Sequence, residues 1–447
     1  MEIKDKNYIL LIGLHVFIGL IIFLIPSLAK LYTICIIVFG LYYVLKTMNR
    51  ENNILLVAGY IVGSEVLLRM TNGNFFYEFS KYGVILFMFI GFYYSGFSKN
   101  AIPMWLFLLL IIPGILVATE TLNLTTDIRK TILFNVSGPI CLGISGIYCY
   151  NRKISFNQVS NVLLAIGLPI ISTTVYLILY TPDLKEILIG TGSNSHTSGG
   201  FGPNQVSTIL GLGMFIFTSR LLLQSNSKLI FVINLILAFN ISFRGLLTFS
   251  RGGMITGLFM IIVLLVFIYR LTKSSGKMKL NFLIFSIFLI FSFTWIYTTN
   301  ETGGLINKRY ANEDAVGKSK SSQLTGREDI FESEFNAFLE HPIFGVGPGK
   351  GMEIREVETG GLKIASHNEI TRMLAEHGLC GILGLFILFL TPIFLYFDNK
   401  QHIFIFCFLG FWLLTINHAA MRIAAPAFVY SLSLLKLYFY EKDTIHR

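Results

Sequence analysis

The chain has 447 residues, of which 54% are hydrophobic, 14% aromatic and only 13% charged, and its formal net charge is +10. A soluble protein of average composition carries about 25% charged residues, so an ordinary soluble enzyme is excluded. Apolar runs near the roughly 20 residues needed to cross a bilayer recur from one end of the sequence to the other. The sequence therefore predicts an all-α fold, a polytopic integral membrane helix bundle.

The first apolar run, residues 8–28, passes into the tripeptide "SLA" (27–29), which mimics a signal-peptidase site. Because the run is longer than the apolar region of a signal peptide, we expect an uncleaved first span. The cysteines all lie within apolar runs and show no metal-ligand spacing, so we expect small buried hydrophobic side chains. They are Cys35, Cys141, Cys149, Cys380 and Cys407.

Fourteen segments have the length and hydrophobicity of membrane spans. In chain order they are 8–28, 31–45, 54–70, 82–97, 101–118, 131–149, 159–180, 204–222, 228–247, 252–271, 280–298, 370–397, 402–418 and 423–440. The short second segment and the pair that flanks Arg251 are the weakest of them. We therefore expect about 12–14 transmembrane helices.

One long polar segment, residues 299–366, interrupts the apolar runs. It contains eight Lys/Arg and eleven Asp/Glu, a net charge of 8 − 11 = −3, although the whole chain is +10. The short loops on the N-terminal side of the membrane carry more Lys and Arg than the other short loops. This bias predicts cytoplasmic termini and a periplasmic 299–366 loop between two parts of the bundle, 1–298 and 367–447. The basic surplus faces anionic lipid and does not indicate nucleic acid.

The stretch Ser366-His367-Asn368-Glu369 ends the loop and opens the next apolar run. A serine followed three residues later by glutamate fits a capping box, which predicts Ser366 as the N-cap and His367 as the first helical residue. The positive end of the helix dipole favours a neutral imidazole there, and a neutral imidazole can serve as a general base. The alternative is a polar residue that only starts a helix.

A second capping box, Thr325-Gly326-Arg327-Glu328, lies inside the loop. Arg327 would stand in the first helical turn, where a cation opposes the helix dipole by roughly 0.3–1 kcal/mol. An anion bound between this arginine and the helix N-terminus would remove that conflict. Alternatively, Arg327 pairs with Asp329 or another carboxylate of the loop.

A third helix start occurs in "FSRGGM", residues 249–254, where we expect Ser250 to cap the following span and Arg251 to open it. The two glycines allow close backbone approach. An arginine at this position is also typical of a membrane anchor. Taken together, two arginines and a histidine at three helix starts on one face favour a site for a phosphorylated substrate.

Weaker candidates lie on the same predicted face. Asn204, in "GGFGPNQ", can cap a helix or contact substrate. His418 and Arg422 are four residues apart and would share a helix face next to Asn417 if the helix continues through them. The segment "GVGPGKG", residues 345–351, lacks a Ser or Thr after its lysine, so we expect a turn and not a phosphate-binding loop.

Four ionisable residues fall within or beside the predicted spans. Glu376 and His377 lie near the membrane boundary, where an ionisable side chain is by default a candidate for function. We expect His15 and Glu65, which are single polar residues inside spans, to face the interior of the bundle.

At these residues the sequence resembles the O-antigen ligase and O-antigen polymerase superfamily of bacterial envelope glycan transferases. The resemblance rests on an ordered set of motifs, namely "GGFGPNQ", "FSRGG", "TGRED", "HPIFGVGPGKG" and "SHNEITRMLAEHGLCGILG". They cover about residues 199–384, on both sides of the long loop. The earlier spans are similar only in being spans.

The resemblance implies a GT-C-like bundle that moves a glycan from an undecaprenyl diphosphate carrier to an acceptor hydroxyl, without a metal or other cofactor. It carries the family's catalytic residues onto Arg251, Arg327 and His367. The two arginines would bind the diphosphate, and the histidine would take the proton from the attacking hydroxyl. Attack opposite the diphosphate would invert the anomeric centre. Substrate-binding candidates of second rank are Asn204, Asn368, His418 and Arg422.

Several functions remain open at this stage. The enzyme can be a polymerase of O-antigen or exopolysaccharide, a ligase acting on lipid A-core, or a transferase acting on protein. The resemblance implies twelve spans for the ligase branch, so the larger span count favours a polymerase or indicates that one span has been divided wrongly into two. A flippase or exporter of the lipid-linked glycan is a different class, but it should line its path with intramembrane charges. A non-catalytic assembly partner is a further alternative.

The expected location is the bacterial inner membrane, with the site on the periplasmic face. Expected partners are the undecaprenyl-diphosphate-linked oligosaccharide, an acceptor glycan or lipid A-core, and the bilayer itself. A chain-length regulator or a flippase is a further expected partner, and nucleic acid is not expected.

Overall fold

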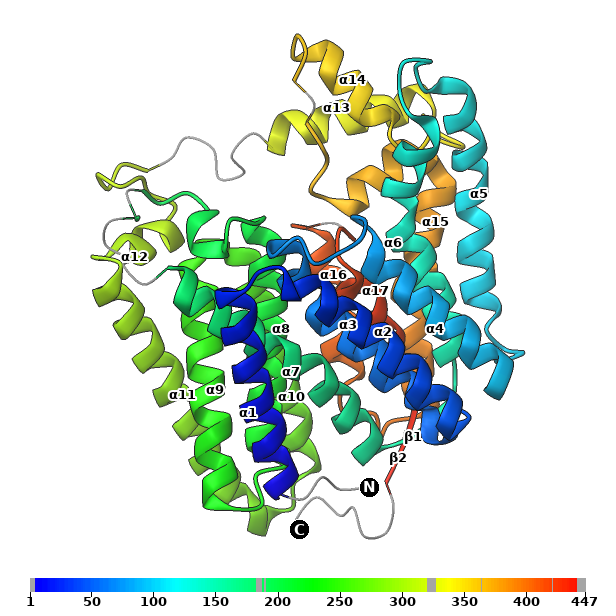
Figure 1. Ribbon diagram of the computed structural model, residues 1–447. Helices are drawn as coiled ribbons and strands as arrows, with labels where there is room; N and C mark the ends of the chain where they lie inside the picture. Colours follow the sequence, from blue (N-terminus) through cyan, green and yellow to red (C-terminus); the bar gives the residue numbers. More distant parts are fainter. Residues whose placement is uncertain are drawn as a thin grey trace.

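The structure, a computed structural model, describes residues 5–181, 187–188, 190–319, 327–362, 364–419 and 421–439. Almost all of the regular structure in these residues is helical, with seventeen α-helices and two short strands. The expected all-α membrane bundle is confirmed. Figure 1 shows most helices running between two ends of the bundle.

Eleven helices of the described chain are long and apolar enough to cross a membrane. They are α1 (Asp5–Leu24), α2 (Leu28–Thr47), α3 (Asn53–Met70), α5 (Ile102–Thr121), α6 (Ile128–Cys149), α7 (Phe156–Tyr180), α8 (Pro203–Leu223), α9 (Lys228–Leu247), α10 (Arg251–Leu271), α11 (Ser274–Glu301) and α15 (Glu369–Asp398). The protein is therefore a multi-pass membrane protein.

Three shorter helices occupy the other predicted spans, so each of the fourteen predicted segments contains a helix. They are α4 (Phe79–Ser95), α16 (Ile405–Ile416) and α17 (Ala424–Leu432). The last two have only 12 and 9 residues, about 18 and 14 Å at a rise of 1.5 Å per residue. These lengths are below the roughly 30 Å hydrocarbon thickness, so the predicted spans 402–418 and 423–440 are helical over only part of their length.

The helices divide into a buried centre and a lipid-facing periphery. In α3, α7 and α8 the most apolar stretch is 78%, 78% and 89% buried inside the protein, whereas in α1 and α11 it is 22% and 17% buried. The periphery exposes large apolar side chains, which are stable next to lipid and not next to water. On α15, for example, Leu383 and Phe386 are 53% and 57% exposed.

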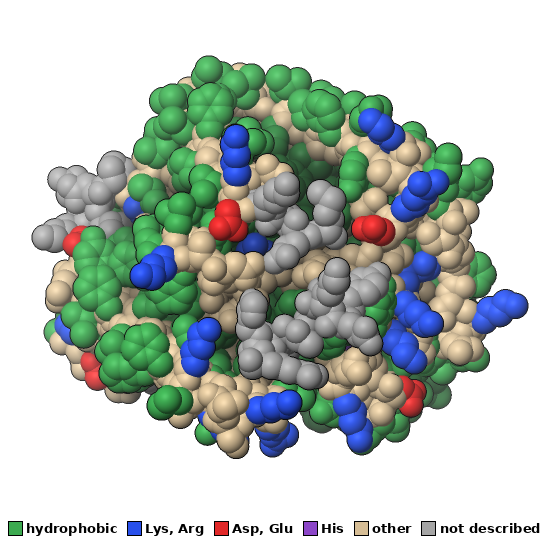
Figure 2. All heavy atoms as spheres, turned by 90° about the horizontal axis from the view of Figure 1, so that it is seen from below, with side chains coloured by type: hydrophobic (Ala, Val, Ile, Leu, Met, Phe, Trp, Pro, Cys, Tyr) green, Lys and Arg blue, Asp and Glu red, His purple; other side chains and the backbone are tan. Residues whose placement is uncertain are grey.

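The two ends of the bundle differ. The end that carries α12 (Leu305–Tyr310), α13 (Arg327–Glu340) and α14 (Lys350–Glu358) is called the loop end below (Figure 1). At the opposite, strand end, β1 (Lys153–Ser155) pairs in parallel with β2 (Lys436–Tyr438). Lys and Arg side chains are spread over the face of the strand end (Figure 2). Two single-turn 3-10 helices, η1 (Arg50–Asn52) and η2 (His196–Ser198), complete the elements.

Helix α15 is interrupted at Gly378, whose φ of 59° and ψ of −143° are not helical. The turn 342–349 packs into this break. The N–H of Val346 donates to the carbonyl of Ala375 at 2.9 Å, and the N–H of Leu379 donates to that of Pro342 at 2.8 Å. Backbone groups freed by the break are thus paired within the protein, as a membrane environment requires. Residues 345–349 of "GVGPGKG" form the expected turn, whereas Lys350 and Gly351 already belong to α14.

The buried polar and cysteine side chains largely follow expectation. His15 and Glu65 are 2% and 1% exposed and face the bundle interior, as predicted. All five cysteines are free, and three of them are buried, while Cys35 and Cys380 are half-buried on peripheral helices.

Candidate active site

The N-termini of α8 and α10 meet at the loop end. Helix α10 begins at Arg251, as predicted, and Ser250 is its N-cap residue, but the Ser250 side chain makes no capping bond. Instead, Ser250 Oγ donates to Asn204 Oδ1 at 2.7 Å. Ser207 Oγ accepts from the N–H of Gly253 at 3.1 Å, and a Cβ at Gly253 would overlap the Ser207 backbone. The "SRGG" motif therefore binds two helix starts tightly together.

His418 lies over the first glycine of the same motif, since a Cβ at Gly252 would overlap the imidazole ring. Its Nε2 is 3.2 Å from Thr208 Oγ1, and its Nδ1 is 2.8 Å from the carbonyl oxygen of Leu414. Asn204 Nδ2 donates to the His418 carbonyl at 3.5 Å. Both ring nitrogens thus have protein partners, which indicates a structural role for His418 in holding α16 against α8.

Replacing Gly252 by alanine should displace His418 and lower the free energy of unfolding by about 1–3 kcal/mol, because the site has no room for a methyl group. Gly13→Ala is the matched control, since a Cβ there meets nothing within 4 Å. In α1 this control should be neutral or stabilising by up to about 1 kcal/mol. Thermal unfolding midpoints in detergent at one scan rate measure both, and equal midpoints would refute the packing argument.

Arg251 turns towards the loop and not towards lipid. Its Nη1 donates to the carbonyl of Arg309 in α12 at 3.4 Å, and Arg309 Nε donates to the carbonyl of Phe249 at 2.8 Å. Burial raises the pKa of the neighbouring Tyr310 to about 12, against the opposing effect of the two arginine charges, so its hydroxyl stays protonated. No carboxylate among the described residues forms an ion pair with Arg251, which leaves its charge available for a ligand.

The start of α15 differs from the predicted capping box. The helix begins at Glu369, and its N-cap is Asn368, whose Oδ1 accepts from the N–H of Ile370 at 2.9 Å. Ser366 instead accepts from the N–H of Asn368 at 3.3 Å. The prediction that Ser366 is the N-cap and His367 the first helical residue is therefore wrong. The exposed His367 precedes the helix. The Glu369 carboxylate pairs with Arg372 inside the protein, so it does not accept a hydrogen bond from the N–H of Ser366 as a capping box requires.

Asn368 and Arg422 link the His367 segment to the rest of the cluster. Asn368 Nδ2 donates to Asn417 Oδ1 at 2.8 Å, and Arg422 Nη2 donates to the carbonyl of Ser366 at 2.8 Å. The Arg422 guanidinium also lies over the ring of Phe134, 4.6 Å from its centroid. Since Asn417 precedes His418 directly, a chain of contacts joins four of the candidate segments, which contain Asn204, Arg251, residues 366–368 and residues 417–422.

Arg327 is described only through its backbone. It is the first residue of α13, while Thr325 and Gly326 of the predicted capping box lie outside the described residues. Helix α13 is fixed to the half of α15 that follows His367, because Glu334 Oε2 accepts from Thr371 Oγ1. The convergence of Arg327 with His367 and Arg251 stays a prediction.

A buried ionic network lies beside the candidates; the sequence singled out one of its members, Glu376, but not the pairing of Glu376 and Glu369 with Arg372. Arg372 Nη1 donates to Glu376 Oε2 at 3.1 Å and to Asn135 Oδ1 at 3.0 Å. Arg372 Nη2 pairs with Glu369, whose Oε2 accepts from the N–H of Met421 at 3.2 Å. The spacing of these charges, i, i+3 and i+7 on one helix face within an apolar segment, was a signal that could have revealed them.

Arg69 forms a second buried ion pair at the same end. Its Nη2 lies 2.7 Å from Glu65 Oε1 and donates to the carbonyl of Arg422 at 3.0 Å. Glu65 Oε2 accepts from the N–H of Ala424 at 2.7 Å. This pair therefore fixes the 421–424 backbone that carries Arg422.

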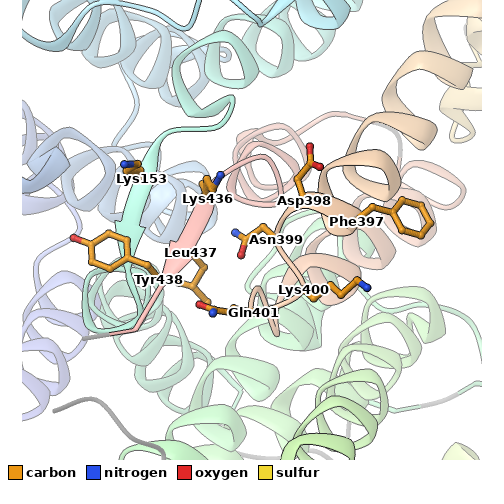
Figure 3. Close-up of a pocket in the computed structure, with 9 residues that line it drawn as sticks. All are labelled: Lys153, Phe397, Asp398, Asn399, Lys400, Gln401, Lys436, Leu437 and Tyr438. Atoms are coloured by element: carbon orange, nitrogen blue, oxygen red, sulfur yellow. The ribbon is translucent and has the colours of Figure 1, made fainter. Parts of the chain in front are cut away.

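A cavity at the strand end is remote from these residues. It is lined by Lys153, Phe397, Asp398, Asn399, Lys400, Gln401, Lys436, Leu437 and Tyr438. Figure 3 shows Lys153 and Lys436 on the paired strands, whereas the Lys400 side chain points away from them. The lysines do not converge on one point, so the loop-end cluster is the candidate active site. No group of three or more His, Cys, Asp or Glu that could hold a metal ion occurs among the described residues.

Comparison with known proteins agrees with the position of this cluster. Residues 233–386 match the family model described as O-antigen ligase, and this range includes Arg251, Arg327, His367 and Asn368. This region is similar to the O-antigen ligase family. The chain is also 30% identical over 164 residues to an uncharacterized protein of Haemophilus influenzae, and the match covers 34% of this chain and 39% of that relative. The chain thus spans about two fifths of the length of the relative it matches.

Proposed function

We propose that the protein is a glycosyltransferase that moves a glycan from an undecaprenyl-diphosphate carrier to an acceptor hydroxyl at the loop end. The observation that carries this proposal is the arrangement at the start of α10. There Arg251, which has no carboxylate partner among the described residues, lies in the family-matched region, and the charges of Arg251 and Arg309 both act on Tyr310. Cations held in this way suit a diphosphate, which is stabilised by charge-assisted hydrogen bonds.

The chemistry follows from the charges involved. Arg251 and Arg327 would hold the diphosphate and stabilise the negative charge that develops on it as the glycosidic bond breaks. His367 would accept the proton of the attacking hydroxyl, and attack from the side opposite the diphosphate would invert the anomeric centre. Two guanidinium groups supply the positive charge this reaction needs, so the proposed mechanism uses no metal.

Asn368 and Arg422 are the proposed substrate-binding residues closest to His367. Asn368 caps α15, and Arg422 donates to the carbonyl directly before His367, so both set the position of the 366–368 segment. Asn204 and His418 are proposed to act from further away, through their contacts with Ser250 and Gly252 at the start of α10.

We propose polymerisation of repeat units as the first form of this reaction, because the sequence contains fourteen apolar segments and the resemblance implies twelve spans for the ligase branch. The helices themselves do not separate the two forms, since eleven helices of the described residues are long and apolar enough to cross a membrane and α16 and α17 are shorter. Transfer of a finished glycan to lipid A-core is the second form, which the printed description of the matched family favours. In both forms the protein is proposed to lie in the bacterial inner membrane, with the loop end in the periplasm. The Lys and Arg side chains on the strand-end face support this orientation (Figure 2).

A glycan gel of cells that lack the gene tests the proposal. Loss of long chains, with single repeat units still attached to the lipid, is expected for a polymerase. Loss of all attached glycan, with accumulation of lipid-linked polymer, identifies a ligase. An unchanged gel would refute glycan transfer, and accumulation of lipid-linked units only on the cytoplasmic face would identify a flippase.

In the same cells, complementation with Arg251→Ala should leave about 10²–10³-fold less transfer activity than wild type, because the developing charge on the diphosphate loses a donor. The activity of Arg251→Lys should be intermediate, since lysine keeps the charge but cannot form the bidentate hydrogen bonds of a guanidinium group. Arg129→Ala, which removes another exposed arginine at the loop end, is the control. A fully active, well expressed Arg251→Ala protein would show that this arginine is only an anchor.

A further inference from the structure

Helix α13 has an unusual pattern of burial. Its polar residues Ser333 and Glu334 are only 7% and 2% exposed, whereas Phe331, Phe335 and Leu339 are 52%, 40% and 59% exposed. The three apolar residues are spaced by four positions and lie on one face of the helix. The rings of Phe331 and Phe335 are stacked, with centroids 5.9 Å apart. The helix therefore turns an apolar face outward.

The rotation of α13 that exposes this face is fixed by buried polar contacts. Glu334 Oε1 accepts from Arg355 Nη1 of α14 at 3.2 Å, and Glu334 Oε2 accepts from Thr371 Oγ1 of α15. Turning the phenylalanines inward would break both contacts and leave a buried arginine unpaired, which is costly. The exposure of the apolar face is thus built into the fold.

The apolar face continues onto the exposed apolar face of α15, a helix that is long and apolar enough to cross a membrane. After α13, Ile343 and Phe344 are 58% and 48% exposed. They join α15 at its break, where the N–H of Leu379 donates to the carbonyl of Pro342. Leu379 is itself 47% exposed and starts the lipid-facing row of α15. We call the residues Phe331, Phe335, Leu339, Ile343 and Phe344 the α13 stripe.

The remaining face of α13 is polar. Asp329, Glu332, Asn336 and Glu340 are all exposed and lie next to the stripe. A helix whose apolar face and charged face are both exposed on the protein surface typically lies in the plane of a membrane surface. The described part of this polar face carries no lysine or arginine. The helix would therefore bind the membrane through contacts with acyl chains and not through anionic headgroups.

We propose that α13 lies in the bilayer interface at the loop end, with the α13 stripe against lipid acyl chains. The consequence for catalysis rests on the proposed function. Helix α13 begins at Arg327, so this docking holds the backbone of a proposed diphosphate-binding residue near the level of the lipid headgroups. The diphosphate of a lipid-linked donor lies at the same level, and its orientation towards Arg327 is then set before the reaction.

Tryptophan fluorescence in proteoliposomes tests the docking. Phe335→Trp places a reporter on the stripe, and Asn336→Trp is a matched control on the adjacent polar face, both measured against the wild type with its three tryptophans. Phosphatidylcholine with brominated acyl chains should quench the added fluorescence of Phe335→Trp, and acrylamide should not. The control should show the reverse. Quenching of Phe335→Trp by acrylamide alone would overturn the proposal and place the stripe in water.

A kinetic comparison separates this inference from the proposed function. The double variant Phe331→Ser/Phe335→Ser should raise KM about tenfold or more for a long-chain polyprenyl donor, since two large apolar contacts with lipid are lost. Its kcat, and its activity on a short-chain, water-soluble donor, should be unchanged. Bromine quenching without any glycan transfer by wild type would refute the proposed function and leave the docking intact. Transfer with an unchanged KM would refute the role assigned to the docking.

Discussion

His367→Ala should lower the rate of glycan transfer by about 10²–10⁴-fold at saturating donor, which is the range for loss of a general base. Since the side chain is exposed and precedes the first turn of α15, the thermal unfolding midpoint should stay close to that of wild type. The measurement is transfer of a radiolabelled glycan from lipid-linked donor by purified protein. Wild-type activity should fall on acidification as imidazole gains a proton, and this limb of the pH profile should be missing in the variant.

His341→Ala is the matched control for this experiment. His341 is another exposed histidine at the loop end, directly after α13, and its loss should leave the rate and the pH profile unchanged. His418→Ala should behave differently from both, because this ring packs on Gly252 and bonds to Thr208. It should lower the unfolding midpoint. If His367→Ala were folded and as active as His341→Ala, the general-base role would be wrong.

The membrane spans could be predicted because each depends mainly on its own composition. A run of about 20 apolar residues forms a helix in lipid whatever its neighbours are, since its backbone must be paired internally. The start of α10 at Arg251 was predicted for a similar reason, because the polar pair before the glycines marks the end of an apolar segment.

Features that depend on distant contacts could not be predicted. The break at Gly378 exists because the turn 342–349, about thirty residues earlier, supplies partners for the opened backbone. The N-cap of α15 is Asn368 and not Ser366. In a capping box the Glu369 side chain would bond to the N–H of Ser366, but here it pairs with Arg372. Short-range signals near Ser366 favoured the capping box, and a buried ion pair outweighed them.

The buried network around Arg372 leads to the second large expected effect. Arg372→Met should lower the free energy of unfolding by about 3–5 kcal/mol, because it leaves two buried carboxylates without their cation. Glu369 and Glu376 are 0% and 4% exposed, so water cannot replace the guanidinium. Transfer activity should fall as well, since Glu369 holds the N–H of Met421 and Glu376 holds that of Gly349.

Two comparisons make the Arg372 experiment decisive. Lys350→Met breaks the ion pair between Lys350 and Glu353, in which the Lys350 side chain is 23% exposed. This variant should lower the free energy of unfolding by less than about 1 kcal/mol, because solvent screens the pair. The triple variant Glu369→Gln/Arg372→Met/Glu376→Gln removes the unpaired charges and should recover much of the stability lost in Arg372→Met. Unfolding midpoints in detergent at one scan rate measure all three. If the triple variant were less stable than Arg372→Met, the lost stability would come from packing of the arginine side chain. The unpaired carboxylates would then not explain the effect of Arg372→Met.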